Sequence, residues 1–170
     1  TTKQKKRLVQ ISTDEVFGSL DKGTAIEDSK LNPSNPYAAT KAAAELLVNS
    51  YVNTYNSDVV ITRCTNNFGP RQFPEKLIPK TIMLCMNNGK IPIYGNGKNI
   101  RDWIYVDDHC EAVLLALLHG KSGESYNISA DNEIDNITIV TKILEIMDKS
   151  KDLIEFVDDR PGHDLRYSMS

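Results

Sequence analysis

A tyrosine and a lysine four residues apart, Tyr37 and Lys41, are the residues of this sequence whose spacing most directly suggests chemistry. They lie in a segment rich in Ala, Glu and Leu, which favours a helix over residues 36–55, and the spacing places both on one helical face. A nearby ammonium group stabilises a phenolate, so we expect Lys41 to lower the pKa of Tyr37 and make it a general base. The same spacing alone also fits an ordinary surface helix.

Three adjacent polar residues, Thr13, Asp14 and Glu15, follow the apolar run of a predicted strand over residues 7–11. In an open α/β sheet, ligands bind just outside the carboxyl ends of the strands. We therefore expect this hydroxyl and these two carboxyl groups to face a substrate rather than the core. Adjacent carboxyl groups can divide acid and base roles only if their surroundings separate their pKa values.

The order of elements around these residues indicates a βαβ unit. Asn35 can cap the predicted helix, Pro36 suits its first position, and a β-branched run over residues 59–62 predicts a second, buried strand. Strand, helix and strand in this order are typical of a parallel sheet. The apolar positions of the helix that fit one helical face are Ala43, Leu46, Leu47 and Tyr51.

A polar loop is predicted over residues 63–74, at the crevice beyond the second strand. Asn66 and Asn67 in this loop fit either turn chemistry or amide hydrogen bonds to a ligand. Beyond it, Gly95-Asn96-Gly97 predicts a hairpin between two short strands. The elements expected after residue 75 are helices at about 76–87, 108–118 and 136–148, and strands at about 91–94, 101–106, 126–128 and 154–157.

Composition excludes several classes of protein. The 170 residues carry a net charge of −3, so the chain has no basic footprint for nucleic acid. Its three cysteines form no C-x-x-C pair, which argues against a zinc site and against a disulfide framework. We find no membrane-spanning stretch and no signal peptide, and we expect a cytoplasmic location with no metal and no membrane partner.

Six motifs together resemble those of the nucleotide-sugar 4,6-dehydratases, which belong to the extended short-chain dehydrogenase/reductase superfamily. The motifs are Ser12–Gly18, Asn35–Lys41, Asn66–Gln72, Phe73–Pro79, Arg101–Asp108 and Arg160–Asp164. The resemblance implies an α/β fold: the C-terminal part of a Rossmann-type doubly wound parallel sheet, with an interleaved smaller α/β substrate-binding domain. Residues 1–66 would belong to the Rossmann domain and 67–170 mainly to the sugar-nucleotide domain, with about 101–129 returning to the Rossmann domain.

The resemblance also implies a catalytic role for each residue of the two opening motifs. Tyr37 would take the proton of the sugar 4-hydroxyl, which Thr13 hydrogen-bonds, while NAD accepts the C4 hydride. Lys41 would hold the nicotinamide ribose. Glu15 would remove the C5 proton, Asp14 would protonate the departing C6 hydroxyl, and hydride would return to C6. The product would be a 4-keto-6-deoxy sugar.

A second set of residues would hold the ligands. Asn67 would lie toward the cofactor, beside Tyr37 and Lys41. Arg101 would bind the diphosphate, although an ion pair with Asp102 or Asp107 is its structural alternative. The residues expected to bind the nucleotide sugar, with dTDP-glucose as the expected substrate, are Asn66, Glu75, Lys76, Leu77, Pro92, Tyr94, Arg101, Asn136, Arg160 and His163.

One expected part is absent from the sequence, namely a strand–G-x-x-G-x-x-G–helix fingerprint for a dinucleotide. We expect about a hundred residues, or about three βα units, to be missing before Thr1. Two other functions stay open: a UDP-sugar epimerase or decarboxylase on the same scaffold, and an inactive sugar-nucleotide-binding or interface module. Asp14 and Glu15 favour the dehydratase, because simple 4-epimerisation needs neither a C5 base nor a C6 acid. The resemblance also implies a homodimer.

Overall fold

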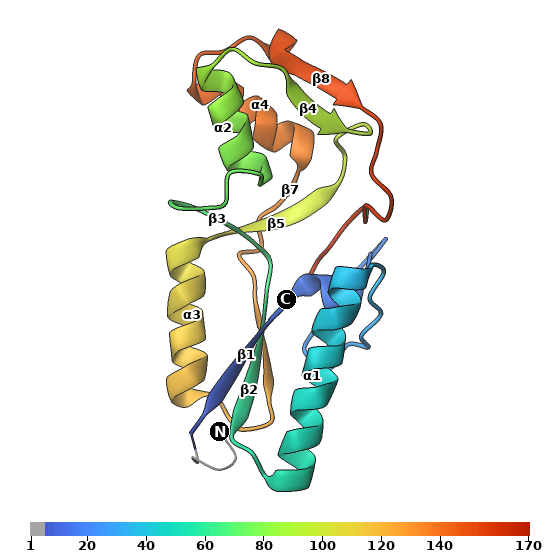
Figure 1. The fold of residues 1–170 in the computed structure, drawn as a ribbon, viewed down its shortest axis with the longest axis vertical. Helices are drawn as coiled ribbons and strands as arrows, with labels where there is room; N and C mark the ends of the chain where they lie inside the picture. Colours follow the sequence, from blue (N-terminus) through green and yellow to red (C-terminus); the bar gives the residue numbers. More distant parts are fainter. Residues whose placement is uncertain (1–5) are drawn as a thin grey trace.

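The computed structural model describes residues 6–170 as two stacked parts, a lower one built on a parallel sheet and an upper one built on two small sheets (Figure 1). The strands are β1 (Leu8–Thr13), β2 (Val59–Cys64), β3 (Asn66–Phe68), β4 (Ile91–Tyr94), β5 (Ile100–Tyr105), β6 (Ser125–Ile128), β7 (Glu133–Asp135) and β8 (Ile154–Val157). The α-helices are α1 (Pro36–Tyr55), α2 (Leu77–Met86), α3 (Val106–His119) and α4 (Asn136–Ile146), and 3₁₀ turns cover Asp14–Phe17 and Lys151–Leu153.

The lower part confirms the predicted βαβ unit. Strand β2 lies between β1 and β6 and pairs in parallel with both. Helix α1 connects β1 to β2, and α1 and α3 lie on either side of this sheet (Figure 1). Because the strands run in parallel, β1 and β2 bring their carboxyl ends to the same edge, which faces the upper part of the molecule.

Helix α1 begins as predicted but buries a different face. The Asn35 side chain accepts a hydrogen bond from the backbone N–H of Ala38 at 2.9 Å, and Pro36 takes the first helical position. The buried positions are Ala38, Ala42 and Glu45, whereas the apolar positions singled out in the sequence (Ala43, Leu46, Leu47 and Tyr51) are exposed. Hydrophobic spacing missed the buried face because that face contains a charged residue.

The upper part differs from the prediction in three places, one of them being strand β7, which the sequence does not predict. The predicted loop over residues 63–74 contains β3, which pairs in parallel with β5. The predicted hairpin between β4 and β5 is wrong. A tight turn does form, with the N–H of Gly97 donating to the carbonyl of Tyr94 at 3.1 Å, but β4 pairs in parallel with β8 while β5 pairs with β3 and β7. Long-range pairing, which local turn chemistry cannot reveal, decides where these strands go. The proposed domain boundaries stay a prediction.

A buried ion pair ties the lower part together around Arg63 of β2. Its guanidinium binds the Glu45 carboxylate of α1, with Nη2 and Oε2 2.8 Å apart. It also donates to the carbonyl of Glu27 at 2.9 Å and lies 4.9 Å from the ring centroid of Phe17. Arg63 therefore joins β2, α1, the 3₁₀ turn after β1, and the loop between that turn and α1.

We predict that Arg63→Met lowers the free energy of unfolding by about 3–5 kcal/mol, because it leaves the Glu45 carboxylate buried without its partner charge. Urea unfolding of the chain followed by circular dichroism measures this loss. Arg7→Met is the matched control: the Arg7–Asp58 pair is partly exposed, so its loss should cost at most about 1 kcal/mol. Equal, small losses for both variants would contradict the central place given to Arg63.

Candidate active site

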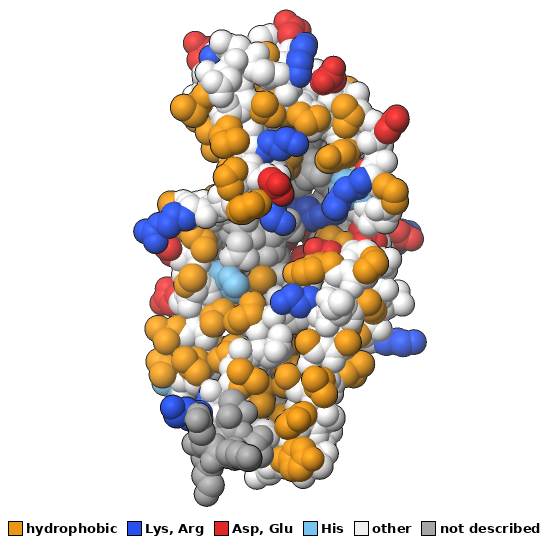
Figure 2. Space-filling model, in the orientation of Figure 1, with side chains coloured by type: hydrophobic (Ala, Val, Ile, Leu, Met, Phe, Trp, Pro, Cys, Tyr) orange, Lys and Arg blue, Asp and Glu red, His pale blue; other side chains and the backbone are white. Residues whose placement is uncertain are grey.

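A cavity of about 700 Å³ lies between the lower and upper parts. Side chains from both parts reach it, and Figure 2 shows several Lys and Arg side chains where the two parts meet. The lining residues are Glu15, Asn35, Pro36, Tyr37, Asn66, Glu75, Lys76, Leu77, Lys80, Pro92, Ile93, Tyr94, Arg101, Trp103, Asn136, Arg160, Pro161, Gly162, His163 and Tyr167.

The two adjacent carboxyl groups after β1 have unlike surroundings. Asp14 is 4% exposed, and burial raises its pKa to about 7. Its Oδ1 accepts a hydrogen bond from the Thr13 hydroxyl at 3.1 Å, while its Oδ2 has no partner among residues 6–170. Glu15 lines the cavity, and its Oε2 accepts from the Asn35 amide at 3.2 Å. At neutral pH a large fraction of Asp14 therefore carries a proton in a buried site, beside a partly buried carboxyl group that lines the cavity.

Tyr37 and Lys41 lie on consecutive turns of α1, as predicted, but Lys41 does not lower the pKa of Tyr37. The pKa of Tyr37 is raised, first by burial and then by the negative charges of neighbouring groups, Glu15 first among them. The Lys41 ammonium donates to the backbone carbonyl of Ile11 at 3.1 Å. Lys41 is partly buried and its ammonium is held at Ile11, whereas the carboxyl groups of Glu15 and Asp14 act on the phenol. Tyr37 thus keeps its proton at neutral pH in this chain.

Positive charge gathers at the start of α2. Lys76 is the N-cap residue of this helix, makes no side-chain capping hydrogen bond, and lines the cavity together with Leu77 and Lys80. The first N–H groups of a helix have no intrahelical partner and favour an anion. Arg101 and Arg160 also line the cavity, which therefore suits a phosphate-bearing ligand.

An aromatic wall closes the upper side of the cavity. Tyr94 of β4 packs edge-on against the ring of His163, with the ring centroids 6.3 Å apart. The Nδ1 atom of His163 lies 2.7 Å from Oδ1 of Asp159. Pro92 and Trp103 extend the wall from β4 and β5. Aromatic and proline side chains of this kind suit a nucleoside base.

Arg101 lines the cavity and, among residues 6–170, forms no ion pair with Asp102 or Asp107. Its guanidinium donates to the backbone carbonyls of Ile100 at 2.6 Å and Asp164 at 2.8 Å, and it lies 4.4 Å from the ring centroid of Tyr167. Asp102 instead accepts hydrogen bonds from the backbone of the segment before β7. Arg101 therefore also fastens the C-terminal segment over the site.

The structure brings most of the predicted site residues to one cavity. Glu15, Tyr37 and the whole set expected to bind the nucleotide sugar line it. Thr13 and Asp14 are buried in and beside the 3₁₀ turn that carries Glu15, while Lys41 and Asn67 lie outside the lining. The role of each residue stays a prediction.

Sequence reasoning missed Lys80, Trp103 and Tyr167, and it assigned Asn35 only a capping role. Lys80 could have been found, because it lies four residues after Lys76 on the same helical face. Tyr167 gave no local signal, since only the fold brings it beside Glu15.

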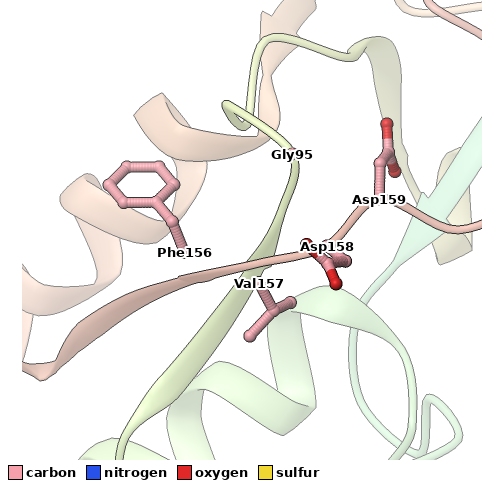
Figure 3. Close-up of a pocket in the computed structure, with 5 residues that line it drawn as sticks. All are labelled: Gly95, Phe156, Val157, Asp158 and Asp159. Atoms are coloured by element: carbon pink, nitrogen blue, oxygen red, sulfur yellow. The ribbon is translucent and has the colours of Figure 1, made fainter.

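A second, open cavity of about 660 Å³ lies where β4 and β8 end (Figure 3). Its lining residues are Gly95, Phe156, Val157, Asp158 and Asp159. The charged side chains among them are both acidic, so this cavity does not suit a phosphate. Among residues 6–170 no group of three or more His, Cys, Asp or Glu side chains could hold a metal ion.

Comparison with known proteins gives the class of this chain. The family model described as GDP-mannose 4,6 dehydratase matches residues 1–169. The chain belongs to this family. It is 53% identical over 163 residues to the low-salt glycan biosynthesis protein Agl12 of Haloferax volcanii and 48% identical over 163 residues to a dTDP-glucose 4,6-dehydratase of Streptomyces niveus. Each match covers 96% of this chain, but the chain spans only about half of the relatives, 53% and 48% respectively.

Solved structures extend the same comparison. DesIV from Streptomyces venezuelae, a dTDP-glucose 4,6-dehydratase crystallised with NAD, is 45% identical with a TM-score of 0.95. That match covers 96% of this chain and 51% of DesIV. A UDP-glucuronic acid 4-epimerase from Bacillus cereus is 27% identical with a TM-score of 0.90, over 96% of this chain and 52% of the epimerase. Within residues 6–170 the fold is therefore that of Rossmann-type sugar-nucleotide enzymes.

Three residues of this chain fit the nicotinamide end of NAD. The buried Oδ1 of Asn67 has no hydrogen-bond partner among the residues that the structure describes, and the partly buried Lys41 ammonium, which has three donors, donates to the carbonyl of Ile11. Tyr37 completes the set at the cavity edge. The glycine-rich fingerprint that cradles a dinucleotide pyrophosphate does not occur in this sequence.

The buried Asp14 should make the folded chain less stable as the pH rises. The folded state binds more protons than the unfolded state between the ordinary pKa of 3.8 and about 7, so stability falls with rising pH in that window. Asp14→Asn, which cannot ionise, should gain stability relative to the native chain by up to about 1.4 kcal/mol per pH unit from pH 5 to 7. Urea unfolding at several pH values measures this. Asp21→Asn, in an exposed loop, is the control, and a pH-independent difference for Asp14→Asn would contradict the assignment.

Proposed function

We propose that the protein containing this chain dehydrates a nucleoside-diphosphate glucose, with dTDP-glucose as substrate, to the 4-keto-6-deoxy sugar in an NAD-dependent reaction. The observation that carries this proposal is the pair Asp14 and Glu15. One carboxyl group is buried with a pKa near 7 and the other lines a cavity rich in cations. Elimination of water needs an acid and a base on neighbouring sugar carbons, which this pair can provide.

The cavity would hold the nucleotide sugar by its two ends. Lys76, Lys80, Arg160 and the uncapped start of α2 would bind the diphosphate. Pro92 and the other residues of the aromatic wall would pack against the base. The sugar would then extend toward the carboxyl end of β1. This placement is supported by the four cationic side chains in the lining, Lys76, Lys80, Arg101 and Arg160, and by Glu15, which follows β1.

The chain's own residues would move the protons of the reaction. Tyr37 would accept the proton of the 4-hydroxyl as a phenolate, with Thr13 hydrogen-bonded to the same oxygen. Burial and the nearby carboxyl groups disfavour that phenolate in this chain alone, because they raise the pKa of Tyr37, and the positive charge of NAD⁺, when bound, would favour it. NAD, when bound, would supply the acceptor for the C4 hydride and later its return to C6. A 4-keto group acidifies the C5–H bond, so Glu15 can remove that proton as a base. Asp14, protonated in its buried site, would give its proton to the C6 hydroxyl, which leaves as water.

Two alternatives remain distinct from this proposal. The first alternative is a UDP-sugar epimerase or decarboxylase, which has the same scaffold, as the Bacillus cereus epimerase illustrates. Simple 4-epimerisation needs neither a C5 base nor a C6 acid, so it would not use the pair Asp14 and Glu15. The second alternative is an inactive sugar-nucleotide-binding module. Binding of NAD separates the inactive module, which needs none, from both enzymes, and the identity of the product separates the two enzymes from each other.

We place the protein in the cytoplasm. This proposal is supported by its free thiols, because Cys64, Cys85 and Cys110 form no disulfide with one another. No helix within residues 6–170 is long and apolar enough to cross a membrane.

Glu15→Gln tests the proposed reaction. The chain would be assayed with NAD⁺ and dTDP-glucose in deuterated water, alone and joined to the N-terminal half of the Streptomyces niveus relative. We expect a product lighter by one water, with solvent deuterium at C5, and a loss of about 10²–10⁴-fold in this activity for Glu15→Gln. Mass spectrometry measures both.

Glu111→Gln, on the exposed side of α3, is the matched control and should keep full activity. An epimerised sugar that has lost no water, or full activity in Glu15→Gln, would rule out the dehydratase. Failure of both forms to bind NAD or to give product would support the inactive module.

We also propose a homodimer formed through the exposed face of α1. This face, here called the α1 face, consists of Leu46, Leu47, Tyr51 and Tyr55, which are 46–63% exposed. The rings of Tyr51 and Tyr55 lie against each other, with centroids 5.3 Å apart. Figure 2 shows hydrophobic side chains spread over this part of the surface. A contiguous apolar face of this kind marks an interaction site.

Leu47→Lys should therefore shift the chain from dimer to monomer, because it places a charge in the middle of the α1 face. Light scattering coupled to size-exclusion chromatography at micromolar concentration measures the mass. Ile146→Lys at the end of α4, where the native side chain is 84% exposed, is the matched control and should stay dimeric. A monomeric native chain would contradict the proposal.

A further inference from the structure

The C-terminal segment brings a tyrosine to the proposed base. Residues 158–168 fold back over the cavity and are fastened by backbone hydrogen bonds from Leu20 to Arg166 and from Ala25 to Ser168, both 3.0 Å long. Tyr167 lies near the end of this segment, with its ring beneath the Arg101 guanidinium, and is only 5% exposed. Its phenol has no part in the proton steps described above.

The Tyr167 hydroxyl stands between two carboxyl groups. It lies 3.3 Å from Oε2 of Glu15 and forms a short hydrogen bond with Oδ2 of Asp164. The Asn35 amide bridges the same two carboxyl groups, 3.2 Å from Glu15 and 3.5 Å from Asp164. A phenol has one proton to donate and can also accept, so the atoms Glu15 Oε2, Tyr167 Oη and Asp164 Oδ2 form a continuous chain for a proton.

The phenol in the middle of this chain stays neutral. Burial raises the pKa of Tyr167 well above its usual range, and the hydrogen bond to the Asp164 carboxylate raises it further. A phenol that cannot release its proton alone can still pass one on, by accepting a proton on one side while donating its own on the other.

The outer end of the chain reaches solvent. Asp164 is half-buried, whereas Tyr167 is buried. Its Oδ2 accepts from the Ser34 hydroxyl at 2.5 Å, and its backbone carbonyl accepts from Arg101 at 2.8 Å and from the Asn99 amide at 3.2 Å. These contacts fix the position of Asp164 at the cavity rim.

We propose that Tyr167 and Asp164 form a proton relay between Glu15 and solvent. The inference rests on the proposed function, in which Glu15 takes the C5 proton. In the relay, the proton on Oε2 of Glu15 passes to Oη of Tyr167 while the phenol proton passes to Oδ2 of Asp164, which releases a proton to water. Both carboxylates and the phenol are then restored, and no electrons are exchanged. The reverse path delivers a solvent proton to C5.

Tyr167→Phe cuts the relay and keeps the ring beneath Arg101. The substrate would be dTDP-glucose deuterated at C5, assayed with NAD⁺ in ordinary water, in this chain and in the chain joined to the N-terminal half of the Streptomyces niveus relative. The native protein should exchange C5 with solvent. In Tyr167→Phe the deuterium taken from C5 should stay on Glu15 and return to C5. The fraction of product molecules that have lost this deuterium to solvent, here called washout, should therefore fall about tenfold or more.

The ratio of retained deuterium to solvent hydrogen at C5 distinguishes a relay from a structural role. A loosened site lowers the rate of product formation without changing where the C5 proton comes from. Tyr126→Phe is the matched control, since the Tyr126 hydroxyl accepts from the backbone of Lys121, outside the cavity. Asp164→Asn should reproduce the retained label and decides the question if Tyr167→Phe yields no product.

The outcomes separate the relay from the proposed function. Equal washout in the native protein and the relay variants would overturn the relay while leaving the dehydratase intact. Absence of a dehydrated product from the native protein would overturn the proposed function, and the relay with it.

Discussion

The buried ion pair between Arg63 and Glu45 is the contact on which the geometry of the site depends. It fixes helix α1 against strand β2 and, through Phe17, against the turn that follows β1. Tyr37 lies on α1 and Glu15 lies on the turn after β1. The ion pair therefore sets the position of these two side chains relative to each other. A buried ion pair tolerates little displacement, because either charge alone in the interior is strongly unfavourable. The lower part of the molecule is therefore a rigid base for a cavity whose other walls come from the upper part.

Two neighbouring residues in the sequence acquire different chemistry from the fold alone. Asp14 turns into the interior beside Thr13 and loses its water, whereas Glu15 turns toward the cavity and its polar partners. The difference arises from burial, since both are carboxylic acids with similar pKa values in water. The C-terminal segment adds to this difference by placing Tyr167 against Glu15 and not against Asp14. Two carboxyl groups with unlike surroundings thus lie side by side on one short turn.

Local patterns in the sequence predicted the βαβ unit, the helix cap at Asn35 and the cavity residues that belong to recognisable motifs. Three features were beyond them, and each depends on contacts between distant segments. The buried face of α1 contains Glu45, whose partner Arg63 lies 18 positions away. Strand β4 pairs with β8 rather than with β5. The pKa of Tyr37 is raised, where helical spacing to Lys41 suggested the opposite, because the fold buries the phenol and brings carboxyl groups close to it, while the Lys41 ammonium is bonded to Ile11.

The central claim is that the cavity between the two parts binds a nucleoside diphosphate through the cations at the start of α2. Calorimetric titration of this chain with dTDP tests it most directly, because it requires neither NAD nor turnover. The account predicts saturable binding by the native chain, weakened about tenfold or more in the double variant Lys76→Met/Lys80→Met and unchanged in Lys142→Met, on the exposed side of α4. Absence of binding, or equal affinity in all three proteins, would contradict the account.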